Sequence, residues 1–94
     1  MNLKERVAKS VHGPSEVQIG KQGLTEGVIN EIKARLEKKE IVKVKILKSA
    51  LVVTGLTRQE IAEKVSHAVR ATLVDVRGRT FILYKPRVKK MPKG

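Results

Sequence analysis

The sequence predicts an α/β fold, a two-layer α+β sandwich with helices on one side of a four-stranded mixed sheet. Two patterns support this prediction. In some segments apolar residues recur about every four positions, as on one face of a helix, and in others they alternate with polar residues, as in a strand. In chain order the segments read α-β-α-β-α-β-β. A chain of 94 residues has room for one such domain, which we assign to residues 1–87, with residues 88–94 as a basic tail.

Three segments are predicted to be helical. Residues 3–11 form a short basic helix that Gly13 ends. A longer amphipathic helix has an apolar stripe that consists of Leu24, Val28, Ile29, Ile32 and Leu36. Thr57 and Glu60 have the spacing of a capping box, so a second amphipathic helix is expected to start there. Its apolar positions are Ile61, Val65 and either Ala68 or Val69. Residues 48–55 fit a strand, a turn or a packed loop equally well.

The predicted strands are four short segments with alternating apolar residues. Residues 17–19 and 41–47 alternate in this way, one before and one after the longer helix. Residues 73–77 and 80–84 flank Gly78, and a glycine between two such segments is typical of a tight hairpin. One apolar face on each strand suits a sheet that is covered on a single side.

The charge of the chain predicts a polyanionic partner. The formal net charge is +12 and the sequence pI is about 10.4. Nucleic acid is the first candidate, an anionic membrane surface the second and an acidic small substrate the third. No apolar run approaches the roughly 20 residues of a spanning helix, and there is no cysteine. We therefore expect a cytoplasmic monomer that binds neither a membrane nor a small-molecule substrate.

Few residues suit base stacking or catalysis. Phe81 and Tyr84 are the only aromatic residues, so stacking of several bases on sheet aromatics is not available. His12 and His67 stand alone, and no nucleophile–base pair or metal-spaced cluster is present. We expect a protein that is not an enzyme and that needs no metal or cofactor. Its contacts with nucleic acid should depend on charge, backbone and shape.

A glycine-bracketed loop is the candidate phosphate site. Gly20 and Gly23 enclose Lys21 and Gln22 between a predicted strand and a predicted helix. Glycines let a ligand approach the backbone closely, and amides at the start of a helix favour anions. Thr25 would add a hydroxyl or cap the helix. The glycines could instead serve only a sharp turn. A Walker A loop is excluded, because Lys21 is followed by a glutamine and not by serine or threonine.

The segment Val17-Gln18-Ile19-Gly20-Lys21-Gln22-Gly23-Leu24-Thr25-Glu26-Gly27-Val28 resembles the signature of the CRM domain (chloroplast RNA splicing and ribosome maturation), including bacterial YhbY-type members. The segments 41–45 and 78–87 resemble that family too, and 48–55 is closer to its archaeal members. The resemblance implies a fold like the C-terminal domain of translation initiation factor 3. It also implies binding of structured ribosomal RNA from large-subunit precursors through Gly20, Lys21, Gln22 and Gly23, or a role in RNA splicing or folding.

Further cationic residues are candidate RNA contacts. Lys43 and Lys45 should lie on the strand face opposite the core, where lysines are often merely solvated. A second group is expected to cluster around the final hairpin and its exit, and it consists of Arg77, Arg79, Lys85 and Arg87. Asp75 is expected to pair with Arg77.

One alternative is a DNA-binding regulator of helix-turn-helix type. Residues 56–65 resemble the first helix of that motif. The motif would need a recognition helix next, whereas the following residues are strand-like.

Overall fold

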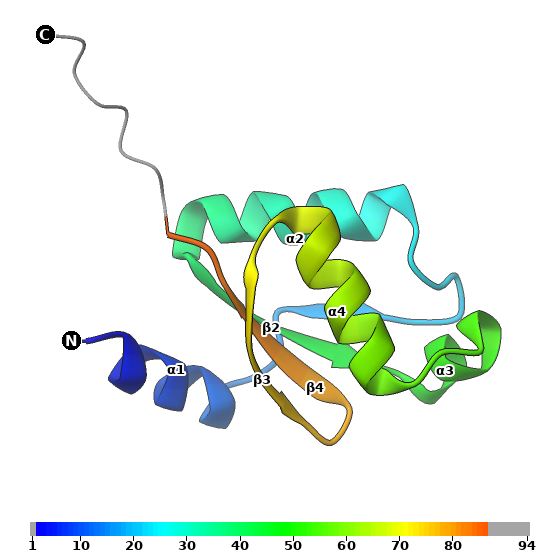
Figure 1. Cartoon of the computed structure of the whole chain (residues 1–94), viewed down its shortest axis with the longest axis horizontal. Helices are drawn as coiled ribbons and strands as arrows, with labels where there is room; N and C mark the ends of the chain where they lie inside the picture. Colours follow the sequence, from blue (N-terminus) through cyan, green and yellow to red (C-terminus); the bar gives the residue numbers. More distant parts are fainter. Residues whose placement is uncertain (1, 87–94) are drawn as a thin grey trace, which may run out of the picture.

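The computed structural model describes residues 2–86 of the chain. Figure 1 shows its elements, which are α1 (Leu3–His12), β1 (Val17–Ile19), α2 (Glu26–Lys39), β2 (Ile41–Ile46), α3 (Lys48–Thr54), α4 (Arg58–Val69), β3 (Thr72–Arg77) and β4 (Thr80–Tyr84). The predicted α/β class is confirmed, and α3 is added to the predicted order. Arg87 and the predicted basic tail lie outside the described residues. No helix in residues 2–86 is long and apolar enough to cross a membrane.

The strands of residues 2–86 form one mixed sheet in the order β1-β2-β4-β3. β1 runs parallel to β2, with Ile19 beside Ile46. β2 and β4 are antiparallel, with Val44 beside Phe81, and β3 and β4 form the predicted hairpin. The parallel pair is joined through α2, as a parallel pair requires a long crossover connection.

The core lies between one face of the sheet and the helices α2 and α4, and we call this face of the sheet the core face. Val42, Val44 and Phe81 are fully buried on it. The predicted apolar stripe of α2 is confirmed, with Ile32 and Leu36 buried. In α4 the buried residue at the end of the stripe is Val69, one of the two that the spacing allowed.

Helix α1 lies on the opposite face, which we call the outer face, so the prediction that all helices pack on one side is wrong for α1. Strand alternation places Ile41 and Ile82 on the outer face with Lys43. Both isoleucines are nevertheless buried, at 5% and 3% exposure, and α1 contacts the two strands that carry them. Figure 1 shows α1 well apart from α2 and α4. The alternating pattern did not predict this position of α1, because it indicated one apolar face, whereas β2 and β4 carry apolar residues on both faces.

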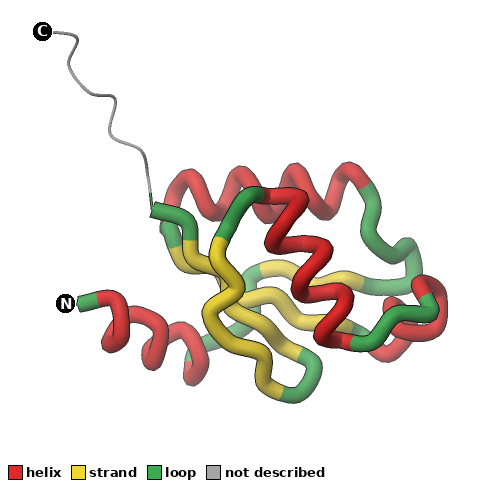
Figure 2. The backbone as a smooth tube through the Cα atoms, viewed as in Figure 1, coloured by secondary structure: helices red, strands yellow, loops and turns green. Residues whose placement is uncertain are grey.

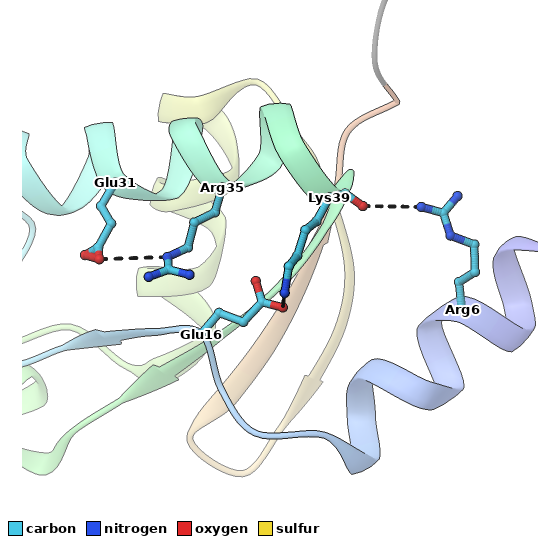
Figure 3. Close-up of polar contacts among 5 residues, drawn as sticks. All are labelled: Arg6, Glu16, Glu31, Arg35 and Lys39. Atoms are coloured by element: carbon cyan, nitrogen blue, oxygen red, sulfur yellow. Dashed lines mark hydrogen bonds and ion pairs between the residues drawn. The ribbon is translucent and has the colours of Figure 1, made fainter.

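Polar contacts tie the N-terminal segment to the end of α2 (Figure 3). A guanidinium nitrogen of Arg6 donates to the carbonyl oxygen of Lys39 at 3.3 Å. The same nitrogen pairs with Glu40 Oε1 at 3.1 Å. Lys39 Nζ pairs with Glu16 Oε1 at 3.2 Å. Arg35 and Glu31 face each other one turn apart along α2, at 3.9 Å. Several cations at this end of the molecule therefore already have anionic partners.

Residues 48–55, which fitted several structures, contain the short helix α3. Ala50 is fully buried in the core, and Leu51 packs partly against it. Gly55 ends the helix in the left-handed conformation at φ 67°, and its N–H donates to the Leu51 carbonyl. The segment is too short for a clear helical period, and two adjacent valines favour a strand. As a helix, the segment places Ala50 and Leu51 against the core.

The capping box at the start of α4 is present as predicted. Thr57 Oγ1 accepts from the Glu60 N–H, and Glu60 Oε1 accepts from the Thr57 N–H. α4 ends at Val69, and β3 follows from Thr72. The helix-turn-helix in which residues 56–65 would form the first helix is therefore not formed.

Candidate nucleic-acid interface

The loop between β1 and α2 is a tight turn with its two polar residues at the tip. The Gly23 N–H donates to the Gly20 carbonyl oxygen at 2.9 Å, which closes a four-residue turn. Lys21 and Gln22, the central residues of this turn, are exposed. The turn therefore presents one cation and a short run of backbone to solvent.

Gly23 is required by the structure in two ways. Its φ is +74°, a conformation that other residues adopt only with strain. A Cβ at this position would lie 3.3 Å from Thr54 Cγ2 and 3.7 Å from Val53 Cγ1, so the loop rests against the end of α3. Figure 2 shows the loop running beside that helix. Gly20 differs, because its φ is not positive and an added Cβ would make only an ordinary contact of 3.5 Å with Leu47.

Thr25 acts as the N-cap of α2. Its hydroxyl oxygen accepts from the Val28 N–H at 3.2 Å, which satisfies one amide of the first turn. Glu26 places a carboxylate in the same turn. That negative charge already interacts with the positive end of the helix dipole. Attraction for an anion therefore depends on the loop amides and Lys21 more than on the helix.

A groove adjoins the loop. It has a volume of about 460 Å³, and it is lined by the loop residues 20–23 together with Val28, Leu47 and Ser49. Leu47 precedes α3 and Ser49 lies in its first turn. The groove thus lies where the loop, α2 and α3 meet.

The β3–β4 hairpin lies at the same end of the sheet as the loop. Ile46 pairs with Ile19 on one side, and its N–H donates to the Arg79 carbonyl oxygen on the other at 2.6 Å. β1 and β4 are therefore separated by one strand, which corresponds to about 10 Å. Arg79 is exposed in the hairpin turn. Lys45 pairs with Gln18 and Thr80 in the same region and points to the outer face.

Arg77 precedes this turn and is paired as predicted. Its Nε lies 2.7 Å from Asp75 Oδ2, yet its side chain stays 67% exposed. An exposed ion pair of this kind is weak and exchanges readily with solvent. Arg77 therefore remains accessible to a stronger anion.

Lys43 has a different environment from Lys45, although both lie on the outer face as predicted. Lys43 Nζ donates to the Gly13 carbonyl oxygen at 2.7 Å, just after α1. The same side chain lines a small cavity of about 70 Å³ with Asp75 and Ile82. Lys43 is thus half-buried within the fold and holds the N-terminal segment in place.

Lys85 is far from the hairpin turn, so it does not join Arg77 and Arg79 in the predicted cluster. β4 separates Lys85 from Arg79, and six residues of extended chain span about 20 Å. Lys85 Nζ donates to the Val69 carbonyl oxygen at 3.1 Å and so caps the last turn of α4. Arg87 lies outside the described residues. Arg79 and Lys85 are close in the sequence, but the strand between them is extended, so they lie at opposite ends of the sheet.

Two residues near the loop were missed by the sequence analysis. Lys48 begins α3 and is exposed, and Ser49 lines the groove. Gly55 was the available signal, since a glycine directly after a helix commonly forms its C-terminal cap. A helix ending there would have placed both residues beside the loop.

Comparison with known proteins matches residues 2–85 to the CRS1 / YhbY (CRM) domain family. A probable RNA-binding protein of Methanocaldococcus jannaschii is 39% identical over 80 residues, which cover 85% of this chain and 58% of that protein. This chain therefore spans little more than half of its length. The probable RNA-binding protein YqeI of Bacillus subtilis is 31% identical over 78 residues, covering 83% of this chain and 77% of YqeI.

A solved structure is also similar. The solution structure of a Staphylococcus aureus protein with a proposed RNA-binding role has a TM-score of 0.67 and 29% identity, over 96% of this chain and 88% of that one. The sequence and structural similarities agree over nearly the whole described chain. This chain therefore belongs to the CRS1 / YhbY (CRM) domain family.

Proposed function

We propose that this domain binds structured RNA by capturing phosphates at the end of the sheet that carries the loop 20–23. One observation carries the proposal, namely that the loop and the turn of the β3–β4 hairpin lie at the same end of the sheet, on either side of the end of β2. Lys21, Lys45 and Arg79 lie there, and Lys21 and Arg79 are exposed. At the other end, Arg6 and Lys85 are engaged within the fold, and Lys39 is exposed and pairs with Glu16. Other exposed cations, such as Lys38 and Arg70, lie away from the loop, so the proposal depends on the loop backbone together with the cations at its end of the sheet and not on charge alone.

The chemistry of this surface suits the RNA backbone. The turn offers backbone without large side chains, and Lys21 adds a full charge at its tip. Arg79 and Arg77 offer planar guanidinium groups, which bind phosphate oxygens in pairs. The relatives from Methanocaldococcus jannaschii and Bacillus subtilis are named probable RNA-binding proteins. By the family resemblance, ribosomal RNA of the large-subunit precursor is the target that we propose.

A salt series tests the role of the loop. Binding of a large-subunit ribosomal RNA fragment is measured for the wild type, Lys21→Ala, Gly23→Asp and the control Lys33→Ala. Lys33 is exposed on α2 and belongs to none of the proposed contacts. Each lost phosphate contact should lower the slope of log affinity against log salt by about 1. Lys21→Ala should lose affinity and slope, Gly23→Asp should lose more affinity, and Lys33→Ala should match the wild type.

The outcome against the proposal is equally definite. Unchanged affinity and slope for Lys21→Ala and Gly23→Asp, with circular dichroism showing an intact fold, would remove the loop from the binding site. Duplex DNA of matched length serves as competitor, and stronger binding to DNA would favour a DNA-binding protein. Crosslinking to cellular RNA followed by sequencing identifies the target. Adducts dominated by introns would favour the splicing alternative over ribosome assembly.

A further inference from the structure

The groove beside the loop has walls of a different character from the rest of the surface. Outside the loop it is lined by Val28, Leu47 and Ser49, that is, two apolar side chains and one hydroxyl. Lys21 is the charged residue among those that line it. A surface that bound only phosphates would gain most affinity from further cations. The chain has a net charge of +12, yet apart from Lys21 no cation of the described residues lines the groove. The groove therefore suits a largely apolar group that carries few polar atoms and is attached to a phosphate.

The apolar character continues along α3. Val52 and Val53 are 82% and 57% exposed, and they are two of the four large hydrophobic residues exposed among the described side chains. Val53 Cγ1 lies 3.7 Å from the position that a Cβ on Gly23 would occupy. The loop 20–23 is thus bordered by the apolar groove and, at Gly23, by the exposed Val53.

The size of the groove fits a nucleoside better than a single side chain. Its volume of about 460 Å³ lies within the range of pockets that hold small organic molecules. A base inside a duplex would have to be extruded to reach it, at a cost of a few kcal/mol, whereas an unpaired nucleotide avoids most of that cost. Proteins that read RNA commonly accept bases from loops and bulges for this reason.

We propose that this groove holds the ribose and base of one unpaired nucleotide, whose phosphate is bound by the loop 20–23. The inference rests on the proposed function and narrows it to structured RNA that contains a bulge or loop. Val28 and Leu47 contact the base, and the Ser49 hydroxyl is placed to exchange a hydrogen bond with the ribose 2′-hydroxyl. Because aliphatic side chains carry little information about base identity, the site selects an unpaired nucleotide and not a particular base.

Three RNA hairpins test the inference with the full chain. The first has a fully paired stem, the second has one bulged nucleotide in that stem, and the third has an abasic residue as the bulge. The bulged hairpin should bind more tightly than the paired one by a factor on the order of ten. The abasic bulge should lose most of this gain, since it keeps the phosphate and ribose but not the base.

Substitutions at Ser49 connect the effect to the groove. Ser49→Phe fills the groove and should remove the preference for the bulged hairpin, while the salt slope on the paired hairpin stays unchanged. Ser49→Ala keeps the groove open but removes the hydroxyl, so it should weaken binding of the bulged and the abasic hairpins alike and retain the preference for the bulged one over the abasic one. Thermal unfolding of both variants checks that the fold is intact.

Failure of this inference differs from failure of the proposed function. Equal affinity for all three hairpins, still weakened by Lys21→Ala, would overturn the groove and leave phosphate binding by the loop in place. A bulge preference that Ser49→Phe does not change would also overturn the groove as its site. No salt-dependent binding to any hairpin would overturn both.

Discussion

Lys43 Nζ donates to the Gly13 carbonyl oxygen at 2.7 Å, whereas Lys45, two residues on along the same face of β2, lies beside Gln18 and Thr80 near the loop 20–23. The two lysines are equivalent in the alternating pattern of the strand. Their surroundings differ because the N-terminal segment covers the outer face at Lys43. One lysine is thus structural, and the other belongs to the proposed interface.

Replacing each lysine by methionine should separate stability from binding. Lys43→Met removes a half-buried charge-assisted hydrogen bond, and the free energy of unfolding should fall by about 1–2 kcal/mol. Lys45→Met should leave stability nearly unchanged and weaken RNA binding. Urea unfolding and RNA titration measure the two effects. The assignment is wrong if Lys43→Met weakens binding without any loss of stability.

The two loop glycines should respond differently to alanine. Gly23→Ala forces a Cβ into a positive-φ position and toward Thr54 at 3.3 Å. The free energy of unfolding should fall by about 1–3 kcal/mol through backbone strain and crowding. Gly20→Ala has neither problem, so stability should be equal or slightly higher. Thermal unfolding of the pair checks this, and equal losses for both variants would contradict the described turn.

Arg79 and Lys85 lie at opposite ends of β4, and removing each should have a different consequence. Arg79→Ala should weaken RNA binding and lower the salt slope by about 1, with little effect on stability. Lys85→Ala removes the donor to the Val69 carbonyl and should lower the free energy of unfolding by about 0.5–1.5 kcal/mol. RNA titration and urea unfolding are again compared. A loss of binding with Lys85→Ala equal to that with Arg79→Ala would show that both ends contact RNA.

The capping box of α4 should make stability depend on acid pH. The backbone N–H and side chain of Thr57, and then Lys64, hold the pKa of Glu60 below its ordinary value of 4.5. A depressed carboxyl pKa stabilises the fold above the unfolded pKa, and this stabilisation is lost as pH falls through the folded value. The unfolding temperature of the wild type should therefore decrease as the pH is lowered below 4.5. Glu60→Gln should reduce that dependence, and an unchanged pH profile for this variant would contradict the assignment.

Much of the fold follows from local sequence patterns. The stripe ending at Leu36 marks α2, the Thr57–Glu60 spacing marks α4, and Gly78 marks the final hairpin. Each of these features depends on interactions between residues that are close together in the chain, so its residue pattern can be recognised in the sequence. The glycine loop was identified in the same way, because turn chemistry is also local.

Tertiary contacts decided the remaining features. The helix α3 packs Ala50 against the core, and α1 covers Ile41 and Ile82 on the outer face. The packing of Gly23 against Thr54 joined the loop to α3, and the pairing of Ile46 with Ile19 and Arg79 brought the loop and hairpin to one end. Each of these contacts joins residues far apart in the chain. No local periodicity encodes such contacts, because they depend on which faces the folded elements present to each other.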